Sequence, residues 1–578
     1  MNRLATLAAA GLTVFAALIT VFAAAITLAP ASVAGQSYRP VTDARLVSPE
    51  PENWLSYRRT YDGWGYSPLD QIDVSNVEDL VPAWAFSTNT TGGHESPPVV
   101  NDGVMFITTP GNQLYALDAR NGDLLWRYRH NLPPGRIAFH DTNRGVALFG
   151  DKVYMATLDA RVVALDASTG EVVWDTPVAD NSEGYYMTLA PLAARGKVMV
   201  GVSGGELGIR GFVVALDAES GEEVWRTYTV PGPGEPGNET WPEGAWRTGG
   251  AAVWITGHYD PDLGLTYWGT GNPGPWIGDQ RPGDNLYTNS VIALAVDTGE
   301  LVAHHQYHWN GSWDWDEVST PLLIDVERDG RTIPGLVHPG RNGYLWILER
   351  SAEAIRFVDA QPFVRQNVFA SLDPVTGRPT YNEDRKPGTG KRAEFCPSLW
   401  GGKDWPPAAY NPTTGLLYIP ANENLCGSSV GVEVEYRPGR AFMGADTDMT
   451  VVPGADHIGE LQAWDINTGE RVWTQEFGSQ NWGPVLTTGG GLVFAGGTSD
   501  RYFRAFDART GEILWQQRTN SGVIGVPSSY MIDGVQYIAV QSGWGVDAAA
   551  MGRRIDGLRG TSNFVPQGGV VWVFALRN

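Results

Sequence analysis

The segment ALDARNGDLLW at residues 116–126 decides the fold, because close copies of it recur along the chain. The copies are ALDASTGEVVW at 164–174, ALDAESGEEVW at 215–225, AWDINTGERVW at 463–473 and AFDARTGEILW at 505–515. A degraded copy at 293–303 keeps Thr298, Gly299 and Glu300 but ends in Ala303 instead of tryptophan. The first three tryptophans lie 48 and 51 residues apart and the last two lie 42 apart. Such self-similarity predicts a repeat protein.

Each copy is typical of a strand, a tight turn and a second strand. In the turn, the aspartate hydrogen-bonds nearby backbone and the glycine accepts a positive φ. The alternating apolar residues on both sides of the turn suit β-strands. A period of 42–51 residues fits one four-stranded propeller blade. Because a single blade cannot bury both of its faces, blades must stack, and the recurring tryptophan offers a large flat surface for that contact.

Weaker units fill the gaps, such as GYLWIL at 343–348 and TGLLYI at 414–419. The period predicts roughly eight blades between residue 45 and the C-terminus, and the last strand, at 569–575, is expected to pair with an early strand near Trp84. We find no linker long enough to divide residues 35–578, so we expect one domain. The predicted fold class is an all-β, eight-bladed β-propeller with tryptophan-docking repeats. The repeat alone does not distinguish an enzyme from a docking scaffold.

The composition narrows the function classes. The 578 residues carry 41 basic and 64 acidic side chains, a net charge of −23, which argues against non-specific binding of nucleic acid. Apolar residues make up 42% of the chain, so a large core is feasible. The 71 glycines and 38 prolines predict many turns and few long helices.

The N-terminus reads as a targeting segment. Arg3 is followed by an apolar stretch over 4–31, and the small residues of Ser32-Val33-Ala34 fit a cleavage site after Ala34. Residues 1–34 are therefore interpreted as a secretory signal, with an uncleaved membrane anchor as the alternative, because the apolar stretch is long. Both interpretations imply export.

Two cysteines, Cys396 and Cys426, exclude a disulfide-rich scaffold, a four-cysteine zinc site and an Fe–S cluster. In an oxidising compartment they could form a disulfide. The sequence has no C-x-x-C-H motif, so no c-type haem is attached to this chain.

Polar motifs lie between the repeats. They include GGELGIRG at 204–211, WITGHYDP at 254–261, GTGNPGPW at 269–276 and WDWD at 313–316. Taken in this order, together with the tryptophan-containing turns, they resemble the quinoprotein alcohol dehydrogenases, which bind pyrroloquinoline quinone (PQQ) in an eight-bladed propeller. The resemblance covers essentially the whole exported chain, from WLSY at 54–57 to the last strand.

The resemblance implies a metal site built from Glu206, Asn272, Asp314 and Asp316. An acid at position 316 resembles the lanthanide-dependent branch of the family, whereas calcium enzymes commonly have a non-acid there. A hard trivalent ion prefers more oxygen ligands and more negative charge than Ca²⁺ does. The competing interpretations are an ordinary loop carboxylate at Glu206 and a turn-capping role for Asp316.

The resemblance also implies a cofactor site. Trp254 matches the tryptophan under the PQQ ring, where an aromatic plane suits a planar quinone, although a chain with 23 tryptophans could use it in the core. Arg341 matches a cation over the ortho-quinone oxygens, where it stabilises developing negative charge. Asp404 occupies a position that often holds Asn, so its role is open. The expected cofactor-binding residues are Glu95, Arg144, Thr188, Ser203, Gly204, Gly205, Trp254, Arg341, Asp404 and Trp482.

One segment departs from the family. Many relatives carry adjacent cysteines just before the segment Asn143-Arg144-Gly145, but this chain has Phe139 and His140 there. The ring-like disulfide of those relatives therefore cannot form, and either of the two side chains could cover the quinone instead. The spacing of Cys396 and Cys426 matches a long-range disulfide of the family.

The expected reaction is oxidation of a small, primary alcohol to the aldehyde with PQQ as the two-electron acceptor. Asp314 is the expected general base and Arg341 the cation that stabilises the reduced oxygen. Electrons would then pass to a separate acceptor such as a periplasmic cytochrome c. The alternatives are a Ca²⁺-dependent sugar, polyol or polymer alcohol dehydrogenase, and a non-catalytic propeller scaffold of outer-membrane assembly. A homodimer stays open.

Overall fold

A computed structural model of the protein describes residues 38–328 and 330–577, so the predicted signal segment at 1–34 lies outside the described residues. The quoted repeat forms two antiparallel strands, β5 (Gln113–Asp118) and β6 (Leu124–Arg129). Between them, Asp118 Oδ1 accepts the N–H of Arg120 at 2.8 Å, and Gly122 takes a φ of +81°. The turn therefore uses Asp and Gly as its sequence predicts.

Each repeat belongs to a sheet of four antiparallel strands, one of which gains a short parallel strand. In chain order the sheets are β3 (Val99–Asn101), β4 (Val104–Thr109), β5, β6; β7 (Val146–Phe149), β8 (Lys152–Ala156), β9 (Arg161–Asp166), β10 (Val172–Pro177); β11 (Leu192–Ala194), β12 (Lys197–Gly201), β13 (Phe212–Asp217), β14 (Glu223–Tyr228); β15 (His258–Asp260), β16 (Leu265–Gly269), β17 (Ser290–Ala295), β18 (Leu301–Gln306); β19 (Leu322–Arg328), β20 (Arg331–Pro339), β21 (Tyr344–Arg350), β22 (Ile355–Pro362); β26 (Ala409–Asn411), β27 (Leu416–Asn422), β30 (Gly459–Asp465), β31 (Glu470–Phe477); β32 (Leu486–Thr488), β33 (Leu492–Ala495), β34 (Tyr502–Asp507), β35 (Ile513–Arg518), with β1 (Tyr66–Ser67) beside β32; and β36 (Ser528–Ile532), β37 (Val535–Ser542), β38 (Val570–Leu576), β2 (Leu80–Ser87).

Two smaller sheets are inserted after β22. They consist of β23 (Phe369–Leu372) with β24 (Pro379–Tyr381), and of β25 (Ala393–Phe395), β28 (Leu425–Gly431) and β29 (Ala445–Val451). The disulfide between Cys396 and Cys426 joins the end of β25 to β28, which confirms the expected pairing.

The repeat tryptophans join each sheet to the next. Trp126 Nε1 donates to the carbonyl of Ala167 at 3.1 Å, and its ring lies over Gly170, where a Cβ would stand 2.5 Å from Cε3. The turn glycine is thus required both by its φ of +75° and by the ring above it. The equivalent hydrogen bonds run from Trp84 to Ala119, Trp174 to Ala218, Trp225 to Val296, Trp473 to Ala508 and Trp515 to Leu80.

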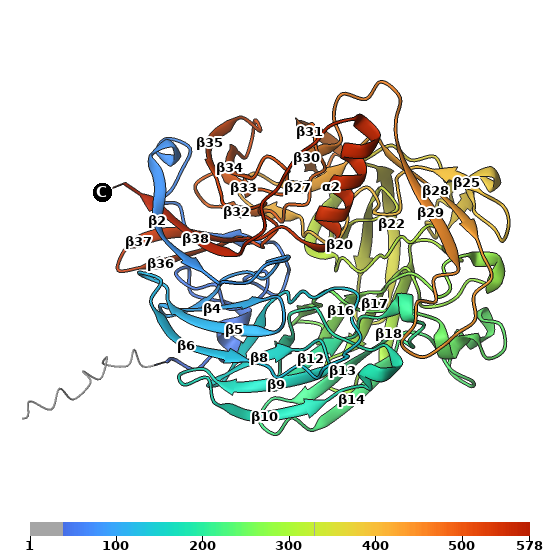
Figure 1. Cartoon of the computed structure of the whole chain (residues 1–578), viewed down its shortest axis with the longest axis horizontal. Helices are drawn as coiled ribbons and strands as arrows, with labels where there is room; N and C mark the ends of the chain where they lie inside the picture. Colours follow the sequence, from blue (N-terminus) through green and yellow to red (C-terminus); the bar gives the residue numbers. More distant parts are fainter. Residues whose placement is uncertain (1–37, 329, 578) are drawn as a thin grey trace, which may run out of the picture. The chain divides into compact units, whose positions relative to one another are not determined.

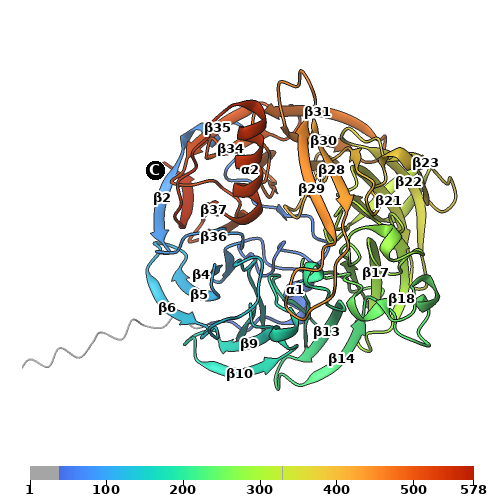
Figure 2. The same ribbon diagram turned by 45° about the vertical axis from the view of Figure 1, so that its right-hand side comes forward.

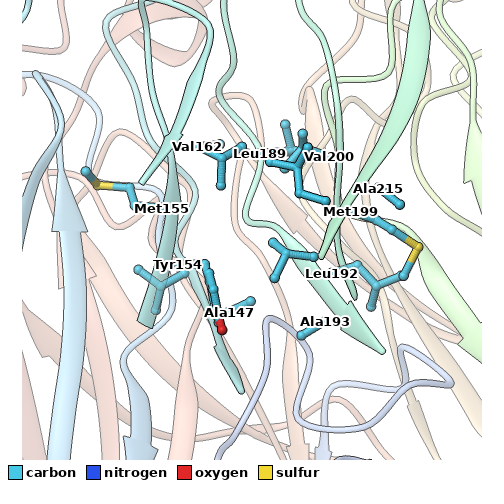
Figure 3. Packing of buried hydrophobic residues seen from close by; sticks show 14 of the residues in the cluster. Ala147, Tyr154, Met155, Val162, Leu189, Leu192, Ala193, Met199, Val200 and Ala215 are labelled. Atoms are coloured by element: carbon cyan, nitrogen blue, oxygen red, sulfur yellow. The ribbon is translucent and has the colours of Figure 1, made fainter. Parts of the chain in front are cut away.

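Within the unit Tyr38–Asn578, the sheets follow one another around a common centre in chain order (Figures 1 and 2). The predicted pairing of the C-terminal strand is present: β38 pairs with β2, with Trp84 opposite Val573. Strands near the centre are buried on both faces, as in β4 and β8, whereas the outer β6 and β10 alternate between exposed and partly buried residues. Figure 3 shows how side chains such as Tyr154, Met155 and Leu192 fill the space between neighbouring sheets.

Helices are few, as the glycine and proline content predicts. The α-helices are α1 (Asp43–Val47) and α2 (Val546–Arg559), and the short 3₁₀ helices are η1 (Val77–Asp79), η2 (Asn181–Glu183), η3 (Gly205–Leu207), η4 (Asn238–Thr240), η5 (Ala245–Thr248), η6 (Gly278–Gln280) and η7 (Glu383–Arg385). In the described part of the chain, none of the helices has the length and apolar character needed to span a bilayer.

Candidate active site

The predicted site residues emerge at one end of the sheets. In a four-stranded antiparallel sheet, the chain passes from the second strand to the third at the same end at which it enters the first strand and leaves the fourth. Glu206 lies between β12 and β13, which are the second and third strands of their sheet. Asp314 and Asp316 lie between β18 and β19, where one sheet ends and the next begins. The topology therefore gathers residues that are far apart in sequence.

These connections surround a cavity of about 320 Å³. Its lining contains five carboxylates and two guanidinium groups, an excess of three negative charges if all are ionised. Such a wall favours a multivalent cation with hard oxygen ligands. The lining residues are Phe139, His140, Arg144, Tyr186, Thr188, Ser203, Gly204, Glu206, Trp254, Trp276, Asp314, Asp316, Arg341, Leu399, Trp400, Asp404, Met443 and Asp547. A larger hollow of about 740 Å³ beside α2 contains none of the predicted site residues, so size alone does not locate the site.

Asp316 ties the predicted metal site to the predicted cofactor floor. Its Oδ2 accepts the indole N–H of Trp254 at 3.0 Å and Nη1 of Arg341 at 3.2 Å. Its Oδ1 accepts the backbone N–H of Asn272 at 2.6 Å. Burial raises the pKa of Asp316, although Arg341 and these N–H donors oppose the rise. The side chain is therefore held in one orientation by three separate segments.

The Asn272 side chain links Asp316 to Trp276. With the amide oriented by its hydrogen bonds, its nitrogen donates to Asp316 Oδ1 at 2.7 Å and its oxygen accepts from Nε1 of Trp276 at 3.0 Å. The carboxylates of Glu206, Asp314 and Asp316 line the cavity beside this amide, and all of these groups carry the oxygen atoms that a hard cation prefers as ligands. The residue types present therefore fit the predicted metal.

Asp314 and Glu206 complete the acidic wall. Asp314 is 9% exposed and has a φ of +61°, a sparsely populated conformation for a non-glycine residue. Burial raises its pKa well above the usual range, Arg341 opposes the rise, and the carboxylates of Asp316 and Glu206 add to it. Burial likewise raises the pKa of Glu206 to about 7, with Asp316 contributing. Bringing a cation to this wall would favour the ionised forms.

The three carboxylates line one cavity without forming a tight cluster of ligand atoms. In the described part of the chain, a group of three acidic or histidine ligand atoms within 4.8 Å of one another occurs at Asp456, His457 and Glu476, outside the cavity, and not at the predicted metal site. Repulsion between like charges favours this spread. The predicted ligand set stays a prediction.

Arg341 lies between two acids. Nη1 contacts Asp316 at 3.2 Å and Nη2 contacts Asp404 Oδ2 at 2.8 Å. Burial alone would lower its pKa, but the carboxylates of Asp404, Asp314 and Asp316 raise it above the usual value. The guanidinium therefore stays charged at the cavity wall, where it can stabilise negative charge on a bound group.

Arg144 contacts several of the residues predicted to bind the cofactor. Nη1 donates to Thr188 Oγ1 at 2.7 Å, Thr188 Oγ1 lies 3.1 Å from Ser203 Oγ, and Nε lies 2.9 Å from Glu95 Oε2. Its guanidinium also lies 4.9 Å from the ring centre of Trp254. Burial raises the pKa of Glu95 to about 7, while Arg144 lowers it. These five residues, predicted from separate motifs, form one connected network.

Some predicted residues lie behind the wall instead of on it. Glu95, Gly205, Asn272 and Trp482 are not among the described residues that line the cavity. Trp482 is buried in an apolar cluster with Trp405, to which Trp254 also packs. Gly204 does line the cavity, with a φ of +113° and no space for a Cβ because the Gly184 carbonyl would stand 2.3 Å away.

Other lining residues were not predicted. Trp276 ends the quoted GTGNPGPW motif, so the motif itself was a usable signal. Asp547 comes from the first turn of α2 and carries no signal in the repeat. Phe139 and His140, by contrast, were singled out from the sequence as side chains that could cover the quinone; both line the cavity, and Phe139 is 46% exposed.

Comparison with known proteins decides the class. Residues 54–369 and 457–538 match the family described as "PQQ: Glucose/ethanol/alcohol dehydrogenase, beta-propeller domain". The chain belongs to the PQQ-dependent alcohol dehydrogenases. The family membership and the enzyme class expected from the motifs are thereby confirmed, and the fold is an all-β propeller.

Several family members align over nearly the whole chain. The quinoprotein alcohol dehydrogenase PedH of Pseudomonas putida is 38% identical over 573 residues, which cover 94% of this chain and 95% of that protein. The lanthanide-dependent methanol dehydrogenase of Methylacidiphilum fumariolicum is 38% identical over 527 residues, covering 86% and 85%. The solved structure of a europium-containing methanol dehydrogenase superposes with a TM-score of 0.87 at 35% identity and covers 92% of this chain and 100% of that one.

Proposed function

We propose that this family member oxidises a small primary alcohol to the aldehyde and uses a trivalent lanthanide ion with PQQ. The observation that carries the proposal is the position of Asp316, which touches the Trp254 indole on one oxygen and lies beside the Asn272 amide on the other. The names of two relatives, which specify a lanthanide and europium, support the same choice of metal. The excess of acidic groups on the cavity wall favours a trivalent ion over Ca²⁺.

In this proposal, Glu206, Asn272, Asp314 and Asp316 hold the ion, and Trp254, with Gly204 and Gly205 nearby, provides the flat surface for the cofactor. Arg144, Thr188 and Ser203 would bind the polar groups of the cofactor, and Glu95 would hold Arg144 from behind the wall. Arg341, with Asp404, would stabilise its quinone oxygens, and Trp482 would support the floor from behind. PQQ supplies the two-electron redox chemistry when it is bound.

The chain's own residues then perform the proton chemistry. Asp314 is the base that accepts the hydroxyl proton of the alcohol, and it must be ionised to do so. Its raised pKa shows that the charged form needs compensation, which Arg341 supplies in part. Arg341 stays protonated, so it would stabilise the negative charge that develops on the quinone oxygens.

We further propose the finer features of the enzyme. They are an eight-bladed propeller, a single domain over residues 35–578, export to the periplasm by residues 1–34 and electron transfer to an external acceptor such as cytochrome c. A homodimer is compatible with these features. The mass of the purified protein in solution tests whether it forms.

The test uses the mature protein, residues 35–578. The protein is stripped of metal, loaded with PQQ and titrated with La³⁺ or Ca²⁺. We expect La³⁺ to restore dye-linked oxidation of a primary alcohol. Tb³⁺ luminescence, sensitised by nearby tryptophans, provides a second reading of ion binding. The variant Asp316→Ala should lose both signals, whereas Asp384→Ala, which removes an exposed carboxylate, should keep them.

The outcomes separate the candidate functions. Restoration by Ca²⁺ alone would reject the lanthanide. Oxidation of sugars or polyols in preference to primary alcohols would replace the substrate class. A colourless, inactive protein would reject catalysis altogether.

A further inference from the structure

A small cavity lies apart from the active site and shares none of its lining residues. Its volume is about 20 Å³, enough for one small particle such as a water molecule or a monoatomic ion. Five separate parts of the chain line it, at 57–63, 255–258, 319–322, 339 and 403–408. Among its lining residues are Arg58 and Lys403, and no carboxylate is among the described residues that line it.

Arg58 brings an incompletely bonded cation to this cavity. The side chain is 2% exposed, and Nη2 donates to the carbonyls of Ala408 and Val485 at 2.8 Å each. Its Nε and Nη1 groups have no hydrogen-bond partner among the described residues. Both acceptors of Nη2 are neutral, so nothing in these bonds balances the charge. A buried guanidinium in that condition is costly unless an anion compensates it.

Lys403 brings a second cation. It is also 2% exposed, and Nζ donates to Ser319 Oγ and to the Asp404 carbonyl, each at 2.8 Å. Both acceptors are neutral, and the third N–H of the ammonium group has no hydrogen-bond partner among the described residues. Burial lowers the pKa of Lys403 to about 7, Asp404 and Glu317 raise it, and Arg58 and Arg341 lower it. The two groups that hydrogen-bond the ammonium are neutral, so neither of these bonds balances its charge.

The Tyr57 hydroxyl adds a neutral hydrogen-bond donor to Arg58 and Lys403. The hydroxyl of Tyr57, which lines the same cavity, has no hydrogen-bond partner among the described residues. In the described part of the chain, no salt bridge within 4.0 Å joins Arg58 or Lys403 to a carboxylate, although buried Lys152 pairs with both Asp151 and Glu219. The cavity has hydrogen-bond donors that lack acceptors and two positively charged side chains, and its volume suits one particle. A small anion has the matching chemistry.

We propose that this cavity is a binding site for a monoatomic anion of the size of chloride, held by Arg58 and Lys403. The anion neutralises two buried cations and links the five parts of the chain around it. Trp405 lines this cavity, and one of its ring centres lies 4.7 Å from the Arg144 guanidinium. The site is separate from the proposed metal and cofactor site, so its test is independent of the proposed function.

Bromide is the probe for the crystallographic test. Crystals of the full mature protein grown in NaBr should show an anomalous difference peak within hydrogen-bond reach of both Arg58 and Lys403. Density without anomalous signal at that place would identify water and overturn the proposal. A peak that needs molar bromide and persists in Lys403→Met would be an adventitious ion only, and would overturn it as well.

Thermal unfolding provides the second measurement. At constant ionic strength, replacing gluconate with chloride should raise the Tm of the wild-type protein in a saturable way, because a ligand that binds only the folded state stabilises it. Lys403→Met should abolish the chloride dependence. The matched control is Lys152→Gln, which removes a buried lysine that already has acidic partners and should keep the dependence. Equal chloride dependence in both variants would contradict the assignment, and the bromide peak decides the matter if Lys403→Met does not fold.

Discussion

Glu317 shows how a single buried residue can position the site without entering it. It directly follows Asp316 and is fully buried. One carboxylate oxygen accepts Nε2 of His338 at 2.8 Å and the backbone N–H of Arg341 at 3.0 Å, and the other accepts the backbone N–H of Asn342 at 3.0 Å. The main chain that carries the Arg341 guanidinium is therefore anchored to the segment that carries the acids.

Glu317→Gln should weaken catalysis through Arg341. The new amide places an N–H₂ group where one of these donors now finds an acceptor, so one buried N–H loses its partner at a cost of roughly 1–3 kcal/mol. A displacement of Arg341 of about 1 Å can reduce kcat by up to about 100-fold. Steady-state kinetics of the PQQ- and metal-loaded enzyme should show a fall in kcat with a smaller change in KM.

The matched control is Glu423→Gln, because Glu423 also accepts a backbone N–H, from Arg365, but does not line the cavity in the described part of the chain. A Glu317→Gln enzyme with unchanged kcat would contradict the positioning role.

At the scale of the element, the repeated turn and the tryptophan of the preceding sheet form one packing unit. The glycine of the turn is held at positive φ and lies directly under an indole, as Gly170 lies under Trp126. Glycine therefore has two reasons to be there, one in the backbone and one in the contact with the neighbouring sheet. The two reasons can be separated because Gly196, at a φ of +70°, has open space around its Cβ position.

Gly170→Ala should destabilise the protein more than Gly196→Ala does. Both substitutions force a side chain into the left-handed region, at about 1–2 kcal/mol. Only the first also drives a Cβ into Trp126, which adds roughly 1–3 kcal/mol of overpacking. Urea unfolding of the two variants and the wild type measures the difference, and equal losses would show that docking of the tryptophan contributes nothing.

At the scale of the whole molecule, buried histidines make stability depend on pH. His305 in β18 is buried, and its Nε2 has no hydrogen-bond partner among the described residues. Burial, followed by the neighbouring His304 and His338, lowers its pKa to about 3. Since an unfolded histidine titrates near pH ~6.5, the unfolded chain binds the extra proton between these values. The stability contributed by neutral His305 is present above that range and is lost as the pH falls.

His305→Phe should remove this dependence. Below pH ~6.5, the free energy of unfolding of the wild type should fall relative to the variant by about 1.4 kcal/mol per pH unit. Urea unfolding at pH ~7.5 and ~5.5 measures the difference between the two proteins, and a constant difference would refute the assignment.

His457→Asn provides a control of opposite sign. Burial would lower the pKa of His457, but Asp456, Glu460 and Glu476 raise it. Its stabilising effect is therefore present at low pH and is lost as the pH rises through the folded-state pKa, so the difference between wild type and this variant should grow on acidification.

Much of the fold could be predicted because its signals are local. The turn glycine at 170 and the tryptophan at 126 recur at the period of a sheet, and strand pairing follows from alternation and turn chemistry. Motif order also located most of the cavity wall, including Asp314 and Arg341. Asp547 escaped prediction because α2 is an insertion outside the repeat, and only its position over the other connections makes it part of the wall.

By itself, the sequence determined the repeat, the strand-turn-strand unit and the acidic and aromatic residue types available for the site, since these depend on neighbours along the chain. The tertiary structure alone decided which oxygen of Asp316 meets Trp254, that Glu317 anchors Arg341, and that Arg58 and Lys403 share a cavity without an acid. The physical reason is that hydrogen bonds and charge balance depend on distances across sheets, which no spacing along the chain records.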